Sequence, residues 1–164
     1  MLDLGTETYD KTTFSGDRYT KYCQNGHSHN ALVFNGIPQQ YGEGGAREFK
    51  VTGDENAFVC TMEISACYPE EVGLLSYVRT FAWQDNVFTV HDKWKAKAPL
   101  KATMTLLSEV PGLGYETNMD SHTEPMHIAD QWLKARWGDT VFRSILTLPE
   151  AKSDGDIYVK IKMD

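Results

Sequence analysis

Hydrophobic and polar residues alternate along most of the chain, and this period of two predicts β-strands. The clearest case is the C-terminal segment, where Ile157, Val159, Ile161 and Met163 alternate with polar or charged residues. The other segments predicted as strands are 31–35, 47–51, 58–64, 74–83, 87–94, 100–106 and 141–148. The pattern therefore predicts a chain built mainly from short strands.

Residues with turn preferences separate these segments. Asn35-Gly36 follows the first strand, and Ser153-Asp154-Gly155 precedes the last one. Gln84-Asp85-Asn86 lies between the segments 74–83 and 87–94. These two segments are therefore predicted to pair as a hairpin.

One segment has helical spacing instead. Hydrophobic residues between Met126 and Trp137 recur at intervals of three and four, which predicts an amphipathic helix with Trp132 and Trp137 in the core. Thr123-Glu124-Pro125 is expected to begin this helix and Gly138 to end it. One short helix in an otherwise all-β chain indicates an antiparallel sandwich or a barrel-like fold. Of these we predict the multi-stranded antiparallel β-sandwich with one short covering helix.

Composition indicates one globular domain spanning residues 1–164, because 41% of the residues are hydrophobic and 24% are charged. The net charge of -7 disfavours binding to nucleic acid, which requires a positive surface. No hydrophobic run is long enough to span a membrane, and no signal peptide is recognisable at the N-terminus. We therefore expect neither nucleic acid nor a membrane as a partner.

The densest chemical signal is Asn25-Gly26-His27-Ser28-His29-Asn30, directly before the predicted strand 31–35. In an extended backbone His27 and His29 point to the same face. Two such imidazoles can bind one metal ion, or one can bind the metal while the other transfers a proton. An ordinary pair of polar loop residues has the same spacing, so the pattern alone leaves both interpretations open.

Several short motifs follow one another in order around this signal. They are Asp3-Leu-Gly-Thr-Glu-Thr-Tyr9, Asp17-Arg18-Tyr19, Gly26-His-Ser-His-Asn-Ala-Leu-Val-Phe-Asn-Gly36 and Gln39-Gln40, with later stretches at 66–69, 78–80, 91–92, 131–138 and 142–145. In their order and spacing they resemble the heparinase II/III-like family of polysaccharide lyases. The similarity extends from about Leu2 to Leu148.

This resemblance implies an α-helical toroid followed by a large antiparallel β-sandwich. It also implies β-elimination on uronate-containing polymers such as heparin, heparan sulfate and alginate. In that reaction the substrate carboxylate is neutralised, a base removes the C5 proton, and an acid protonates the departing O4. His27 is the residue that the resemblance assigns to catalysis in the sandwich.

Three residues near the histidine motif are candidates for binding the substrate: Arg18, Tyr19 and Asn30. For Arg18 a solvated surface position is the alternative, and for Tyr19 a packing role. No part of the chain could form a helical toroid. We therefore expect the sandwich part of a larger lyase, inactive alone, with an acidic polysaccharide and the missing toroid as partners. The parent protein is expected, by analogy, in the periplasm or outside the cell.

The alternative is a non-catalytic sandwich that binds carbohydrate or serves a structural role. It is favoured by the missing toroid and by the acidic net charge.

The resemblance further implies a structural zinc held by two histidines and one carboxylate. The motif assigns His29 as the first ligand, and approximate spacing assigns His91 as the second. Glu43 is the nearest acidic residue, although it does not align securely. An incomplete set of ligands binds zinc weakly. His29 is therefore the predicted ligand if zinc is bound.

Overall fold

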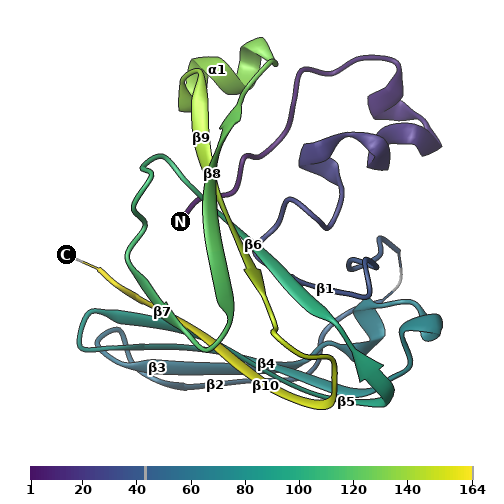
Figure 1. Cartoon of the computed structure of the whole chain (residues 1–164), viewed down its shortest axis with the longest axis vertical. Helices are drawn as coiled ribbons and strands as arrows, with labels where there is room; N and C mark the ends of the chain where they lie inside the picture. The colour runs from purple at the N-terminus through teal and green to yellow at the C-terminus, as the bar shows by residue number, and fades with distance from the viewer. Residues whose placement is uncertain (43, 164) are drawn as a thin grey trace.

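Two antiparallel β-sheets form the framework of the protein in the computed structural model, which describes residues 1–42 and 44–163 (Figure 1). The larger sheet contains, in spatial order, β2 (Arg47–Gly53), β3 (Phe58–Glu63), β4 (Leu74–Gln84), β5 (Val87–Leu100), β10 (Lys152–Lys162) and β7 (Tyr115–Thr117). The smaller sheet contains β1 (Leu32–Phe34), β6 (Ala102–Ser108), β9 (Thr140–Thr147) and β8 (Asp120–His127). The predicted all-β sandwich is confirmed.

The main hydrophobic core lies between the two sheets. Alternate residues of the larger sheet face inward, including Trp94 and Ile157, and they meet Leu106 and Leu146 of the smaller sheet. Phe34 of β1 packs with its ring centroid 5.1 Å from that of Trp94. In β5 and β10 the period of two in the sequence therefore marks the residues that face the core.

A third layer covers the other face of the smaller sheet. It consists of the N-terminal segment, with the 3-10 helices η1 (Thr12–Phe14), η2 (Gly16–Thr20) and η3 (Tyr22–Gln24), and of the helix α1 (Gln131–Trp137) (Figure 1). A second hydrophobic cluster lies beneath this layer: Leu4, Cys23, Leu107, Ile128, Leu133 and Val141. The expected short covering helix is therefore present. Two further 3-10 helices, η4 (Ser65–Cys67) and η5 (Glu70–Val72), join β3 to β4.

The helix begins later than its sequence spacing predicted. Thr123–Pro125 belongs to β8, which pairs with β9 along its whole length. The helix starts after Asp130, whose side chain accepts hydrogen bonds from the backbone N–H groups of Trp132 and Leu133. Pairing with β9 overrides the helical spacing, and Pro125 disfavours a helical conformation at the residue before it.

Two smaller predictions are also wrong. Trp132 was expected in the core, but it is 69% exposed, because Leu133 and Trp137 already occupy the buried side of this short helix. The predicted turn at Ser153–Gly155 lies inside β10, which has an irregularity between Lys152 and Asp154. The indole ring of Trp94 crosses the strand at Gly155, where a Cβ atom would overlap the ring.

No helix in the described residues is long and apolar enough to cross a membrane.

Gly155→Ala tests this close contact. A Cβ at position 155 would overlap the indole of Trp94, which is only 1% exposed and has no room to move. We expect the free energy of unfolding, measured by urea denaturation, to fall by about 1–3 kcal/mol or more. Gly114→Ala is the control, because a Cβ there meets nothing within 4 Å. Equal stabilities of the two variants would contradict this account of the core.

Candidate functional site

The histidine-bearing loop, residues 25–30, leads into β1 and packs against the segment that follows β1. A Cβ on Gly26 would come within 2.7 Å of the Cβ of Pro38 and 3.0 Å of the carbonyl oxygen of Gln39. Glycine is therefore required for this approach of two backbones. The contact brings His27 and His29 beside residues 37–41.

A tight turn positions the ring of His27. Asn35 and Gly36 have φ values of 51° and 81°, and Phe34 and Ile37 exchange backbone hydrogen bonds around them, as in a two-residue hairpin turn. The Nε2 atom of His27 lies 3.3 Å from the carbonyl oxygen of Gly36. A carbonyl can only accept a hydrogen bond, so Nε2 carries the proton. In the neutral ring Nδ1 is then the free proton acceptor.

His29 is oriented by a carboxylate in the same way. Its Nδ1 lies 2.6 Å from Oδ2 of Asp3, to which it donates a hydrogen bond. The free nitrogen is therefore Nε2. A histidine whose other N–H is held by a carboxylate is well oriented as a metal ligand.

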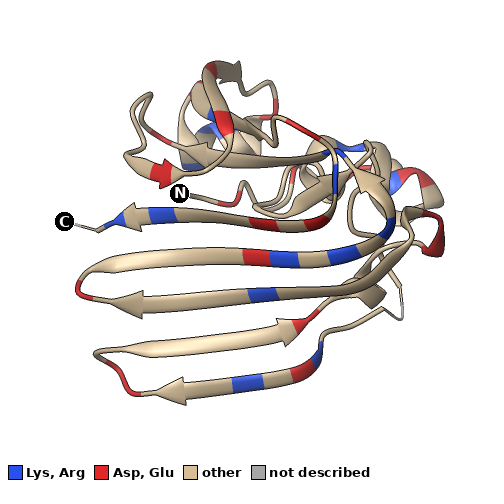
Figure 2. Ribbon diagram, turned by 60° about the horizontal axis from the view of Figure 1, so that its bottom comes forward, with Lys and Arg blue, Asp and Glu red and all other residues tan. Residues whose placement is uncertain are grey.

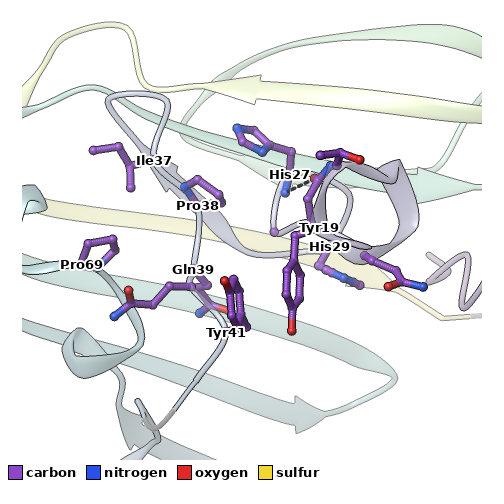
Figure 3. Close-up of a pocket in the computed structure, with 13 residues that line it drawn as sticks. Tyr19, His27, His29, Ile37, Pro38, Gln39, Tyr41 and Pro69 are labelled. Atoms are coloured by element: carbon purple, nitrogen blue, oxygen red, sulfur yellow. Dashed lines mark hydrogen bonds between the residues drawn. The ribbon is translucent and has the colours of Figure 1, made fainter. Parts of the chain in front are cut away.

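His27 and His29 line a pocket of about 600 Å³ together with Tyr19 (Figure 3). The segment after β1 supplies Gln39 and Tyr41 to the same pocket. Pro69, directly before η5, also lines it. The structure thus brings together three of the residues predicted from the sequence. It also adds Tyr41, which the sequence analysis did not select.

Arg18 and Asn30 lie outside the lining of this pocket. Arg18 is adjacent: its guanidinium is 5.4 Å from the ring centroid of Tyr19, and its Nε donates to Oε1 of Gln24. Asn30 makes structural contacts, since its Nδ2 donates to the carbonyl oxygen of Leu2 and its own carbonyl accepts from Arg79. Neither contact points Asn30 toward a ligand.

A buried ion pair holds the histidine-bearing loop on the larger sheet. Arg79 of β4 contacts Asp92 of β5 through Nε at 2.7 Å and a terminal nitrogen at 2.8 Å. Its other terminal nitrogen donates to the carbonyl oxygen of Asn30 at 2.9 Å. Tyr77 also donates to Asp92, at 2.9 Å. Burial, with the Asp92 carboxylate alongside, raises the pKa of Tyr77 well above its usual range, so this hydroxyl remains a donor.

The pocket is lined by amide, hydroxyl and apolar side chains together with the two histidines. Of its described residues, none is lysine, arginine, aspartate or glutamate. Along the strands of the larger sheet, basic and acidic residues are interspersed (Figure 2). Lys93 pairs there with Asp156, and Lys160 with Glu116. A ligand in this pocket would therefore meet amides, hydroxyls, imidazoles and aromatic rings.

His91 lies apart from the pocket. Its neighbours in β5, Val90 and Asp92, face the interior, so its side chain is on the outer face of the larger sheet. Its Nε2 donates to Asp156 at 2.6 Å, and this hydrogen bond lowers the pKa of the Asp156 carboxyl. His29 and His91 are thus oriented by different carboxylates on opposite sides of the sheet.

Comparisons with solved structures show which proteins share this fold. The heparan sulfate lyase HepC from Pedobacter heparinus superposes over 99% of this chain with a TM-score of 0.60 and 12% sequence identity. A structure described as heparinase III, the BT4657 gene product, superposes over 97% with a TM-score of 0.59 and 11% identity. The chain has the fold of a heparinase-like β-sandwich. It covers only 28% and 27% of the lengths of those two chains.

Searches based on sequence add no further match to this heparinase-like sandwich. No family model matches the chain, and no curated protein matches it significantly.

The zinc site predicted from the resemblance has one candidate ligand in the heparinase-like sandwich. In residues 1–42 and 44–163, no three His, Cys, Asp or Glu side chains are grouped so that they could hold a metal ion. Glu43, the suggested carboxylate, lies outside the described residues. His29 alone does not make a zinc site, and no step proposed below depends on a metal.

Zinc at His29 remains a prediction that metal analysis can test. Protein purified without a histidine tag should hold little zinc, because an incomplete ligand set binds weakly. Any zinc that is bound should be lost in His29→Ala and retained in His91→Ala, which changes the outer face. If the purified protein contains no zinc and a chelator leaves its melting temperature unchanged, zinc has no part in this fold.

Asp92→Asn tests the ion pair that holds the loop. The substitution keeps the shape of the side chain but leaves the Arg79 charge buried without a counterion. We expect the free energy of unfolding to fall by about 3–5 kcal/mol in urea denaturation.

The control for this substitution is Lys93→Ala. It breaks the exposed pair between Lys93 and Asp156 on the other face of the same strand. This substitution should lower the free energy of unfolding by less than about 1 kcal/mol. A similar loss of unfolding free energy in both variants would show that the buried Arg79–Asp92 pair stabilises the fold no more than the exposed pair does.

Proposed function

We propose that this domain is the sandwich part of a uronate-polysaccharide lyase and contributes His27 to the catalytic cleft. The observation that carries the proposal is the orientation of His27 at a pocket that no lysine, arginine, aspartate or glutamate lines. Its Nε2–H is held by the carbonyl of Gly36, and Nδ1 is left free. The similar folds of a heparan sulfate lyase and a heparinase III support the same class of reaction.

In this proposal His27 acts as the general base of β-elimination. Nδ1 of the neutral ring takes the proton from C5 of the uronate, and the electron pair of the C5–H bond forms the C4–C5 double bond. The bond from C4 to O4 breaks, and an acid protonates the departing oxygen. A positioned base of this kind contributes about 10²–10⁴-fold to a rate.

The described pocket lacks a group that could neutralise the uronate carboxylate. Neither arginine nor lysine lines it, and the two histidines are oriented by Gly36 and Asp3. We therefore infer that catalysis needs groups from a further domain, as the short coverage of the lyase chains also suggests. An acidic polysaccharide and a helical toroid are the proposed partners, and the periplasm or the cell exterior is the proposed location.

A non-catalytic, carbohydrate-binding role is the second candidate. It is favoured by the same lining, because amides and aromatic rings bind sugars without performing chemistry.

His27→Ala in the complete gene product distinguishes the two candidates. Elimination produces an unsaturated uronate that absorbs in the ultraviolet, so the initial rate with heparan sulfate or alginate can be followed directly. We expect the rate to fall by about 10²–10⁴-fold, because the proton acceptor is lost. The matched control is His122→Ala, which removes an exposed histidine from β8 and should leave the rate unchanged. Full activity of His27→Ala would reject the catalytic role and leave carbohydrate binding as the function.

A further inference from the structure

A second hollow lies on α1, and its volume is about 600 Å³. This α1 hollow is lined by Thr8, Gln131, Trp132, Ala135 and Arg136. Among the described residues, none lines both this hollow and the pocket that His27 lines. In Figure 1 α1 lies at the end of the smaller sheet that is farthest from the larger sheet. The α1 hollow is therefore a separate site.

The packing of the helix does not explain the position of Trp132. The residue is 69% exposed, whereas Leu133 and Trp137 hold the helix on the second hydrophobic cluster. In the part of the chain that the structure describes, the aromatic pairs do not include its indole. Single exposed aromatic residues are common on protein surfaces. The groups beside Trp132 therefore decide what the hollow can bind.

Arg136 lies one helical turn after Trp132, and residues four apart in a helix share a face. Its guanidinium is 4.9 Å from the ring centroid of Trp137. That ring is fixed in turn, because its Nε1 donates to the carbonyl oxygen of Leu4 at 3.0 Å. Within residues 1–42 and 44–163, no carboxylate pairs with Arg136. The N–H donors of its guanidinium are thus held beside the hollow and can bind an anion.

The acidic residue at this end of the helix does not line the α1 hollow. Oδ1 of Asp130 accepts hydrogen bonds from the backbone N–H groups of Trp132 and Leu133. Oδ2 of the same side chain accepts from the N–H of Thr8. Both oxygens therefore serve to cap the helix and to hold Thr8 beside it. The described lining carries one positive charge, that of Arg136, and no negative charge.

These groups are complementary to a uronate sugar. The indole of Trp132 can contact the apolar face of a pyranose ring. The guanidinium of Arg136 can bind the carboxylate through two parallel hydrogen bonds. Gln131 and Thr8 add an amide and a hydroxyl, which both donate and accept hydrogen bonds as sugar hydroxyls do. A small anion would use only the arginine, so the combination favours a ligand with an apolar face and a carboxylate.

We propose that the α1 hollow is a second binding site for uronate-containing oligosaccharides, separate from the pocket that His27 lines. The choice of a uronate rests on the proposed function; the contact with Trp132 and the anion at Arg136 rest on the hollow itself. A polymer held here stays attached to the domain, which raises its effective concentration at the pocket.

Titration of the 164-residue chain, followed by nuclear magnetic resonance, locates the ligand. The probe is a glucuronate–N-acetylglucosamine hexasaccharide. The signal is the indole Nε1–H of Trp132, assigned as the one that Trp132→Phe removes. We expect this signal to shift until the site is saturated. No tryptophan lines the described pocket of His27, so binding in that pocket alone would leave the signal in place.

Arg136→Gln tests the carboxylate contact. The dissociation constant for the probe should rise about tenfold or more, because charge-assisted hydrogen bonds are lost. With the carboxyl-reduced form of the same hexasaccharide, the substitution should change the dissociation constant by less than about twofold. Lys95→Gln is the matched control, because it removes an exposed positive charge from β5. It should stay within about twofold of the unchanged chain with either probe.

Trp132→Ala tests the contact with the sugar ring. Followed through the backbone N–H signal of Ala135, binding of both probes should weaken about tenfold. Phe49→Ala is the matched control, because Phe49 is 64% exposed on β2 and lines neither the hollow nor the pocket. It should bind both probes as the unchanged chain does. Circular dichroism and urea denaturation establish that each variant is folded.

Four results would overturn the second site. They are a Trp132 signal that does not move, equal losses in Arg136→Gln with the two probes, equal losses in Trp132→Ala and Phe49→Ala, and an indole of Trp132 that another domain covers in the complete gene product. Failure of the proposed function is distinguishable. Full elimination activity in His27→Ala with a shifting Trp132 signal would reject the catalytic role and retain the second site. Lost activity in His27→Ala with an unmoved Trp132 signal would do the opposite.

Discussion

The oppositely charged side chains of Arg79 and Asp92 are buried between the two sheets, where each is the counterion of the other. Asp92 is 1% exposed and accepts hydrogen bonds from both Arg79 and Tyr77. Moving such charges out of water is costly unless their hydrogen-bonding groups are satisfied. The remaining donor of Arg79 is satisfied by the carbonyl of Asn30. The sheet therefore needs the histidine-bearing loop in place, and the loop is fixed by the sheet.

The pocket is built from this anchored loop and from a turn that leaves little freedom. Asn35 is held by hydrogen bonds in both directions with Lys101, at the corner where the chain passes from β5 to β6. Gly26 allows the loop to touch Pro38. The loop, the turn and the junction of the two sheets thus position one another. This explains how a site made mainly of irregular segments can hold its imidazoles in defined orientations.

The alternation of hydrophobic and polar residues predicted the strands well where one face of the strand is buried and the other is exposed to solvent. In β10 the alternation of Ile157, Val159 and Ile161 with polar residues directly reflects the core. It failed at β8, where pairing with β9 decides the conformation and the local spacing of hydrophobic residues resembles that of a helix. For the site, the histidine motif was visible, but the stacking of Tyr41 on Tyr19 joins residues 22 positions apart through irregular backbone. The Arg79–Asp92 pair depends on the register of the β4–β5 hairpin, in which Gln84 pairs with Val87 and Arg79 lies opposite Asp92. The hydrophobic pattern predicted this hairpin but not its register.

The hydrogen bond between His27 and Gly36 also bears on how a proton could move. The carbonyl accepts the same Nε2–H whether the ring is neutral or has gained a second proton at Nδ1. The ring therefore need not rotate, and no neighbouring dipole need reverse, when its charge changes. A site whose groups keep their orientation through a change of charge avoids the reorganisation energy that water would require. In the elimination that we propose, the turn formed by residues 34–37 would thus allow the imidazole of His27 to take up and release a proton without changing its orientation.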